Sequence, residues 1–414
     1  MLHFRRSLTL VLAFVLVAAP GAQSLKPGAP ESVGMSAERL GRIRTAMQGM
    51  VDAGEIPGIE TLVARRGVVV HHERIGVAAD AIFGMASMTK PVTSVAIMML
   101  LEDGKLLLSD PVSRFIPSFR EMRVLAPKGS TTNGDDTGTV PAQRQITIDD
   151  LLTHTSGLIY GVFERGPLGE MYKKSGVYDG LGGKRPASLA EQMDLLAKQP
   201  LKFQPGTAWN YSIGIDLLGR IIEVASGMSL EEFFRVRIFE PLGMRDTTFS
   251  LPAAKASRLV TLHAIEKGAM IRAKEQGDYV NVGYYSGGAG LVSTGRDYLR
   301  FAQMLLNGGE LDGVRLLSRK TVELMTTSHT IDIGPSAVSS GYGFGYGFSV
   351  RESLGLSSRI GSEGMYTWSG ILGTYFWVDP KEQLAAVLML QLYPRPDERA
   401  REVFVALTYA AIQN

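Results

Sequence analysis

The 414-residue sequence contains no cysteine, and this absence removes several classes of site at once. Without thiols the chain forms no disulfide, binds no metal through thiolate and carries no lipid on cysteine. The six histidines do not compensate, because none of them lies in a metal-ligand spacing such as H-E-x-x-H. The adjacent His71 and His72 are expected to point to opposite faces of a strand. We therefore expect neither a metal nor any other cofactor.

The sequence also lacks a large excess of charge of either sign. Lysine and arginine together number 43, and aspartate and glutamate 41. Two of the 43, Arg5 and Arg6, lie in the first 24 residues, so the rest of the chain carries 41 of each sign. A balanced chain has no electrostatic footprint for nucleic acid or for an anionic membrane surface, and we expect neither partner. The oligomeric state stays open.

Long hydrophobic runs are absent except at the start of the chain. Residues 1–24 have a basic beginning, an apolar run over 8–19 and then small residues, which is typical of a secretory signal peptide. This run is shorter than the roughly 20 apolar residues that span a bilayer, so an uncleaved anchor is the less favoured alternative. We expect a secreted or periplasmic protein with no stable membrane span in its mature form.

Strand-like segments occur near both ends of the chain. After a helix expected from Ser36 to Gly54, two β-like stretches cover 59–67 and 68–76, and further β-like stretches lie within 344–392. The region between the two ends is mostly helical in pattern. The sequence therefore predicts one sheet domain made from both termini and interrupted by a helical domain. The expected division is a sheet subdomain at about 25–85 and 280–414 and a helical subdomain at about 86–279.

Local signals in the middle region mark helix starts and one loop. Ser188 with Glu191, and Ser229 with Glu232, have capping-box spacing. The polar stretch 126–145 is typical of a surface loop.

The stretch FGMASMTKPVTSVAIMML, residues 83–100, begins an apolar helix with a serine and a lysine three residues apart. Positions i and i+3 share a helix face, so Lys90 can reach the hydroxyl of Ser87. Burial and the positive end of the helix dipole both favour the neutral amine of Lys90, which is a base. A serine hydroxyl beside a base can act as a nucleophile. On spacing alone, a capping serine with a surface-reaching lysine explains the pattern better.

Three other segments change that balance: LLTHTSGL at 151–158, PGTAWNYS at 205–212 and TWSGILGTYFWVDP at 367–380. With the Ser87 stretch they form an ordered set that resembles the penicillin-recognising serine hydrolases, namely class C β-lactamases, DD-peptidases and their esterase relatives. The resemblance runs from about residue 30 to the C-terminus. It implies an α/β (α+β) fold of the β-lactamase/DD-peptidase type, with an antiparallel sheet flanked by helices and an inserted helical domain.

The resemblance also implies roles for individual residues. Ser87 matches the nucleophile, Lys90 its lysine, and Tyr211 the tyrosine of the second motif. The third motif is occupied by Trp368, Ser369 and Gly370. The backbone N–H groups of Ser87 and Ile371 would form the oxyanion hole. Whether Lys90 or Tyr211 is the immediate base stays open, because their titrations are coupled.

Two departures from the family pattern concern the substrate. The position two residues after the tyrosine, usually asparagine in β-lactamases and DD-peptidases, is Ile213, and the usual lysine of the third motif is replaced by Trp368. Losing a polar and a cationic anchor disfavours an anionic peptide-like substrate. With tryptophan at this place the chain resembles the family VIII carboxylesterases. The resemblance implies that the partner is a small-molecule substrate, a short neutral acyl ester, which is hydrolysed through an acyl-enzyme.

Several alternatives stay open beside the esterase interpretation. A β-lactamase, a D-amino-acid-specific peptidase and a transesterase would share every one of these catalytic residues. A non-catalytic sensor that binds cell-wall fragments would belong to a different class, and intact Ser87, Lys90 and Tyr211 argue against it.

Other candidate residues fit less well. No serine lies in G-x-S-x-G, which excludes the nucleophile turn of an α/β-hydrolase. His154 precedes a tight turn at Ser156–Gly157 and is interpreted as structural. Asp149 and Asp150 are interpreted as first-turn helix residues. The glycine-rich stretch 341–348 lacks the lysine of a phosphate loop and is interpreted as a close-packed β segment.

Overall fold

The computed structural model describes residues 25–126, 138–180, 185–274, 277–280, 282–333, 340–394 and 398–414. The signal peptide predicted at 1–24 and most of the loop predicted at 126–145 lie outside these ranges. None of the helices within the described ranges combines the length and the apolar character that a bilayer crossing needs.

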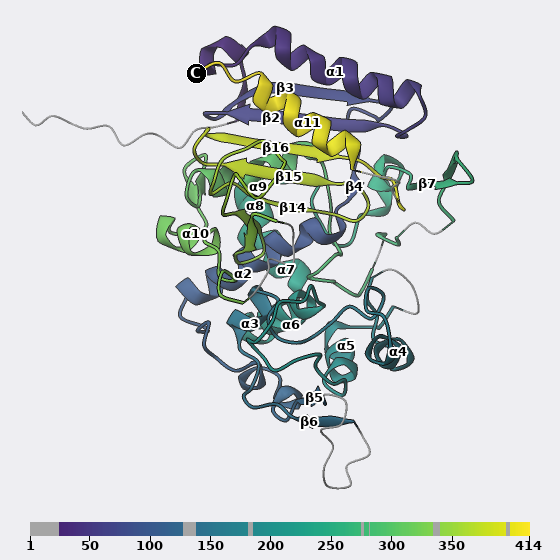
Figure 1. The fold of residues 1–414 in the computed structure, drawn as a ribbon, viewed down its shortest axis with the longest axis vertical. Helices are drawn as coiled ribbons and strands as arrows, with labels where there is room; N and C mark the ends of the chain where they lie inside the picture. Colours follow the sequence, from purple (N-terminus) through teal and green to yellow (C-terminus); the bar gives the residue numbers. More distant parts are fainter. Residues whose placement is uncertain are drawn as a thin grey trace, which may run out of the picture.

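In the described part of the chain, eight strands form one sheet in the order β1-β3-β2-β16-β15-β14-β13-β12 (Figure 1). Neighbouring strands run antiparallel, except that β1 and β3 are parallel. The strands are β1 (Lys26–Pro27), β2 (Ile59–Arg65), β3 (Val68–Ile75), β12 (Tyr342–Phe344), β13 (Ser349–Arg351), β14 (Tyr366–Ser369), β15 (Tyr375–Asp379) and β16 (Leu384–Met389). The sheet thus joins both ends of the chain, and the predicted antiparallel α/β fold is confirmed.

The hairpin of β2 and β3 shows how the sequence sets this sheet. Its turn residues Arg66 and Gly67 have φ values of 50° and 75°, the left-handed conformation that a tight hairpin turn requires at both central positions. The ring of His71 packs against Phe404, 6.3 Å between centroids, on one face of the sheet. His72 bonds to Glu60 on the other face. The two β stretches predicted at 59–67 and 68–76 and the opposite orientations of the two histidines are confirmed.

Helices cover both faces of the sheet (Figure 1). On one face α1 (Ala37–Asp52) and α11 (Arg399–Ala410) pack on each other. On the other face α9 (Gly295–Leu306) packs on β2, β15 and β16. Each face therefore has its own apolar core: the smaller includes α1 and α11, and the larger extends from α9 into the helical region.

The helical region contains the remaining helices. They are α2 (Thr89–Glu102), α3 (Ile148–Leu152), α4 (Pro167–Lys174), α5 (Leu189–Leu196), α6 (Gly214–Ser226), α7 (Leu230–Phe234), α8 (Glu240–Leu242) and, nearer the sheet, α10 (Arg319–Met325). Short tighter or wider helical turns are η1 (Pro30–Val33), η2 (Ala86–Met88), η3 (Val112–Arg114), η4 (Pro117–Phe119), η5 (Arg235–Phe239) and η6 (Ala253–Arg258).

Within the described ranges, four small strand pairs lie outside the main sheet. They are β4 (Phe83–Gly84) with β9 (Val292–Ser293), β5 (Arg123–Leu125) with β6 (Thr139–Pro141), β7 (His263–Glu266) with β8 (Ala269–Arg272), and β10 (Glu310–Leu311) with β11 (Val314–Arg315). The prediction of a loop over 126–145 is wrong for Thr139–Pro141, because these residues form β6 and pair with β5. The β segment predicted at 341–348 is confirmed over Tyr342–Phe344, which form β12, whereas residues 345–348 are not part of a strand.

Candidate active site

Ser87 lies in the short turn η2, which leads directly into α2. The prediction placed Ser87 within the first turn of one α-helix, and the structure has a tighter 3-10 turn there instead. The preceding Ala86 has a φ of 44°, a left-handed conformation that is costly for a residue with a side chain. Met85 supports it, because its N–H donates to Leu291 at 2.9 Å and its carbonyl accepts from Thr374 at 3.1 Å. The segment before Ser87 is thus held from two sides.

Lys90 is fully enclosed in the protein, with only 1% of its surface exposed. Its Nζ donates to the carbonyl of Gly288 at 2.8 Å and to the Oγ of Ser87 at 3.3 Å. Burial lowers the pKa of Lys90 to about 7, although the charge of Asp216 acts in the opposite direction. Near neutral pH a large fraction of Lys90 is therefore the unprotonated amine, which can accept a proton.

Tyr211 approaches the same oxygen from a different segment of the chain. Its phenolic O–H donates to the Oγ of Ser87 at 2.7 Å. Burial raises the pKa of Tyr211 above its usual value, and the bond to Ser87 opposes that shift. The Nζ of Lys90 lies 4.7 Å from the centre of the Tyr211 ring. The serine oxygen is therefore shared by a phenol and an amine that also contact each other.

The ring of His154 packs against that of Tyr211, and among the described residues no hydrogen bond joins His154 to Ser87. The two rings are 4.9 Å apart between centroids. The Nδ1 of His154 accepts the backbone N–H of Ser212 at 3.3 Å. Burial lowers the pKa of His154 well below its usual value, and the charge of Lys90 lowers it further, so the imidazole is neutral. This position agrees with the structural role expected from the sequence.

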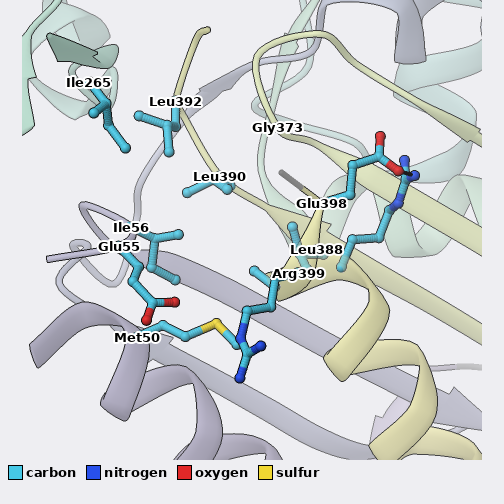
Figure 2. Close-up of a pocket in the computed structure, with 12 residues that line it drawn as sticks. Met50, Glu55, Ile56, Ile265, Gly373, Leu388, Leu390, Leu392, Glu398 and Arg399 are labelled. Carbon is cyan, nitrogen blue, oxygen red and sulfur yellow. Dashed lines mark ion pairs between the residues drawn. The ribbon is translucent and has the colours of Figure 1, made fainter. Parts of the chain in front are cut away.

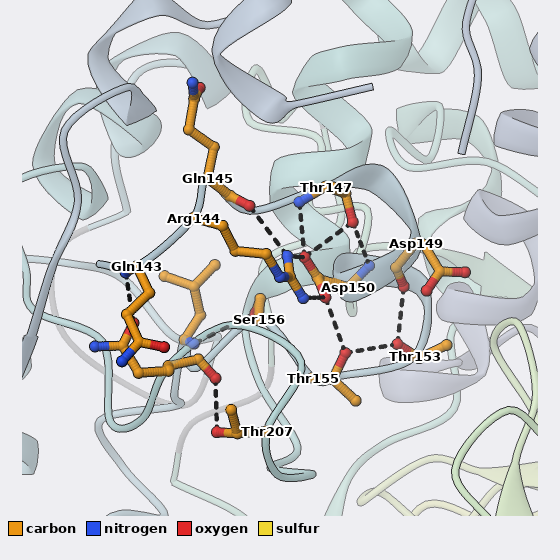
Figure 3. Close-up of polar contacts among 12 residues, drawn as sticks. Gln143, Arg144, Gln145, Thr147, Asp149, Asp150, Thr153, Thr155, Ser156 and Thr207 are labelled. Carbon is orange, nitrogen blue, oxygen red and sulfur yellow. Dashed lines mark hydrogen bonds and ion pairs between the residues drawn. The ribbon is translucent and has the colours of Figure 1, made fainter. Parts of the chain in front are cut away.

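A buried carboxylate fixes the loop that carries His154 (Figure 3). Asp150 accepts two hydrogen bonds from Arg144, at 2.6 and 2.8 Å, and one from the backbone N–H of Thr147 at 2.8 Å. It also accepts a bond from Thr155 at 3.3 Å. Thr147 and Asp150 form a complete capping box at the start of α3. Asp149 and Asp150 are therefore first-turn helix residues, as predicted.

The third motif ends β14 and packs on the segment before Ser87. A Cβ on Gly370 would lie 2.4 Å from the carbonyl oxygen of Met85, so this close approach requires glycine. Ile371 belongs to the small apolar cluster that contains Ala86. Within the described residues the backbone N–H of Ile371 makes no hydrogen bond. Ser369 pairs with Tyr375 at the end of the strand.

The two residues that depart from the family pattern lie in different surroundings. Trp368 is half-buried, and its ring packs against Tyr211 at 5.5 Å and Phe344 at 5.2 Å between centroids. Ile213 is the second of these residues, and its contact with the substrate stays a prediction. Only 1% of its surface is exposed, because it packs in the larger core just before α6. The ring of Trp368 is thus in direct contact with the Ser87–Lys90–Tyr211 group.

The sequence interpretation missed a buried carboxylate that acts on Lys90. Asp216 lies on α6 with 3% of its surface exposed, and its Oδ1 accepts a hydrogen bond from Ser286 at 2.6 Å. Burial raises the pKa of Asp216, while Ser286 and the charge of Lys90 oppose that shift. A signal was present in the sequence, because Asp216 interrupts the apolar stripe of α6 beside Leu217.

A separate cavity of ≈160 Å³ lies on the other face of the sheet (Figure 2). Its apolar lining includes Met50, Leu388 and Leu390, which belong to the smaller core. Neither Ser87, Lys90 nor Tyr211 lines it. Within the described ranges, no group of three or more histidine, aspartate or glutamate residues is arranged to hold a metal ion.

Comparisons with known proteins place this arrangement in context. The sequence model of the Beta-lactamase family matches residues 43–410. Esterase EstB of Burkholderia gladioli is 30% identical over 359 residues, covering 80% of this chain and 85% of EstB. Lovastatin esterase of Penicillium rubens (strain ATCC 28089 / DSM 1075 / NRRL 1951 / Wisconsin 54-1255) is 30% identical over 390 residues, covering 84% and 92%. The structure of EstCE1, described as a hydrolase with promiscuous acyltransferase activity, aligns with a TM-score of 0.76 at 26% identity, covering 90% of this chain and 99% of EstCE1.

Proposed function

The chain belongs to the Beta-lactamase family and is a serine hydrolase, and from this premise we propose that it is a carboxylesterase for short neutral acyl esters. The observation that carries the proposal is the convergence of Tyr211 and Lys90 on the Oγ of Ser87, at 2.7 and 3.3 Å. A serine oxygen that contacts both a buried amine and a phenol has a route for its proton when it attacks a carbonyl carbon.

The reaction would proceed in two steps. In the first, the Oγ of Ser87 bonds to the acyl carbon, its proton passes to the Lys90/Tyr211 pair, and that proton then leaves with the alcohol. In the second, water bonds to the acyl carbon and gives up a proton to the same pair. The bond between that carbon and the Oγ of Ser87 then breaks, the proton returns to Ser87 and the acid leaves. The backbone N–H groups of Ser87 and Ile371 would receive the negative charge that develops on the carbonyl oxygen in both steps.

The ester preference rests on Trp368. A substrate carboxylate placed beside this apolar ring would lose its hydration without gaining a cation, at a cost of about 1–3 kcal/mol. That cost corresponds to a handicap of roughly tenfold to hundredfold in kcat/KM where it persists in the transition state. Neutral esters avoid it. The names of EstB and of lovastatin esterase support an ester as the substrate.

The test is a hydrolysis screen of short and long p-nitrophenyl esters beside a chromogenic cephalosporin. We expect the short esters to be turned over fastest, and Ser87→Ala to be inactive while remaining folded. A phosphonate ester should label Ser87, as located by mass spectrometry. Trp368→Lys should raise the ratio of cephalosporin to ester hydrolysis. Preferential turnover of the cephalosporin by the unaltered protein would favour a β-lactamase or peptidase instead.

A further inference from the structure

A single glycine connects Lys90 to the buried carboxylate of Asp216. The carbonyl of Gly288 accepts the hydrogen bond from the Nζ of Lys90 at 2.8 Å. The backbone N–H of the same Gly288 hydrogen-bonds to the Asp216 carboxylate. The contact is so close that a Cβ on Gly288 would lie 2.3 Å from the Oδ2 of Asp216. Any displacement of the carboxylate is therefore transmitted to the group that orients Lys90.

Further contacts hold this carboxylate in place. The hydroxyl of Ser286 donates to Oδ1 of Asp216 at 2.6 Å, and that of Tyr284 lies 3.5 Å from the same oxygen. On the other side, Thr93 of α2 donates to the carbonyl of Gly287 at 2.6 Å. The segment 286–288 is thus clamped between α2, which carries Lys90, and α6, which carries Asp216.

The groups around Lys90 are otherwise neutral near pH 7. His154 is an uncharged imidazole because burial lowers its pKa well below the usual value. Tyr160 and Tyr211 lie 5.2 and 4.7 Å from Nζ, measured to their ring centres, and burial raises the pKa of each phenol. Burial raises the pKa of Tyr284 as well. Among the described residues, Asp216 is the acidic group whose charge acts on Lys90.

We infer that Asp216 is a positioning residue of the proposed reaction, which stabilises the ammonium form of Lys90 and holds Gly288 in the orientation that aims Nζ at Ser87. The inference rests on the proposed function. When the Oγ of Ser87 bonds to the acyl carbon, its proton passes to the Lys90/Tyr211 pair. A nearby fixed negative charge lowers the energy of the cation formed on Lys90. The proton then leaves with the alcohol, and the amine of Lys90 is restored.

The test is Asp216→Asn, which keeps the size and acceptor oxygen of the side chain and removes its charge. The readout is the pH dependence of two rates, the labelling of Ser87 by a fluorophosphonate probe and kcat/KM for a p-nitrophenyl ester. Without the carboxylate the ammonium of Lys90 loses stabilisation, so the acid-side midpoint should move down by roughly one pH unit. The plateau rate should fall on the order of tenfold, because a weaker base is left at the site.

Asp297→Asn is the matched control. Asp297 is a buried carboxylate on α9 that accepts the backbone N–H of Asp246 at 2.7 Å, and it does not contact Lys90. This variant should leave the midpoint unchanged. Ser286→Ala removes a hydrogen bond that stabilises the charge of Asp216, so it should shift the midpoint in the same direction by less. Where Asp216→Asn does not fold, the midpoint of Ser286→Ala tests the inference instead.

An unchanged midpoint in Asp216→Asn, with or without a lower plateau, would overturn the inference, because a purely structural residue lowers the rate without moving the titration. Where Asp216→Asn does not fold, an unchanged midpoint in Ser286→Ala would overturn it. Failure of the proposed function has a different signature: no ester is hydrolysed, or the probe labels the Ser87→Ala variant as well as the unaltered protein. Labelling of Ser87 without ester turnover would refute the esterase proposal and still report the midpoint.

Discussion

At the scale of single residues, burial moves the pKa values of Lys90 and Tyr211 in opposite directions. The pKa of the lysine falls to about 7 and that of the tyrosine rises, because in both cases the charged form loses hydration. Near neutral pH the uncharged combination of amine and phenol is therefore well populated. Both contact the Oγ of Ser87, so a proton that reaches either one is available to the other. We therefore propose that the two side chains act as one proton-transfer unit.

A double-mutant comparison tests that unit. Lys90→Ala and Tyr211→Phe should each lower kcat by about a hundredfold or more, because each interrupts the same proton route. The double variant should be little worse than either single one, since residues that act together are strongly non-additive. Steady-state kinetics on a p-nitrophenyl ester measures all three, with thermal unfolding as the control for folding. Losses that multiply fully would show that the two residues act independently.

The pH profile of the unaltered enzyme follows from the same residues. Protonated Lys90 cannot accept a proton, so kcat/KM should rise with pH and reach half of its plateau near pH 7, the pKa of Lys90. On the alkaline side the plateau should extend past the usual range of a tyrosine, because the pKa of Tyr211 is raised. Initial rates across the pH range provide the measurement. An acid-side midpoint near that of an ordinary carboxylate would point to an aspartate or glutamate as the base.

At the scale of elements, starts and turns were predictable because they depend on neighbouring residues. Ser36 caps α1 as predicted, accepting the N–H of Arg39 at 3.2 Å. Ser188 and Ser229 cap α5 and α7 in the same way. Their glutamates do not complete the capping boxes, however: Glu191 accepts from the N–H of Ala187, and Glu232 pairs with Arg235. Long side chains choose among several partners, and sequence spacing does not decide between them.

Two helix caps test whether the effect of a cap on kcat can be separated from its effect on the free energy of unfolding. Ser36→Ala and Thr147→Ala should each lower the free energy of unfolding by about 1 kcal/mol, the usual loss of an N-cap. Thr147 begins α3, which leads into the His154 loop behind Tyr211, so only its replacement should also lower kcat. Chemical denaturation and ester kinetics on both variants provide the comparison. Equal kcat values would show that the loop does not depend on this cap.

At the scale of the whole molecule, the sheet made from both termini was predictable because strand patterns occur at both ends. The grouping of Ser87, Lys90 and Tyr211 was predictable only through resemblance, since nothing local relates residues 87 and 211. Asp216 and Gly288 were not predicted as neighbours of Lys90, because packing of the segment 286–288 between two helices brings them there. Proximity created by tertiary packing leaves little trace in the sequence around each residue.

The two cores on either side of the sheet should serve different purposes. Phe376 and Trp377 are consecutive on β15 and face opposite cores, since side chains alternate along a strand. Trp377 packs against Phe404 of α11, 5.2 Å between ring centroids. Phe376 packs against Tyr298 at 5.1 Å, and the hydroxyl of Tyr298 donates to the carbonyl of Met88 at 2.8 Å. Of these two sets of contacts, only the one from Phe376 through Tyr298 leads to the segment that contains Ser87.

Phe404→Ala and Phe376→Ala therefore form a matched pair, each removing a fully buried phenylalanine. Both should lower the free energy of unfolding by about 3–5 kcal/mol, the usual loss for such a cavity. Phe404→Ala should keep normal kcat per folded molecule, because the sheet separates it from the site. Phe376→Ala should lower kcat, because Tyr298 loses its support beneath Met88. Denaturant unfolding measures the free energy of unfolding. Ester kinetics measures kcat per folded molecule, with the amount of active enzyme determined by active-site titration with the fluorophosphonate. A lower kcat in Phe404→Ala would mean that the core under α1 and α11 also positions Ser87.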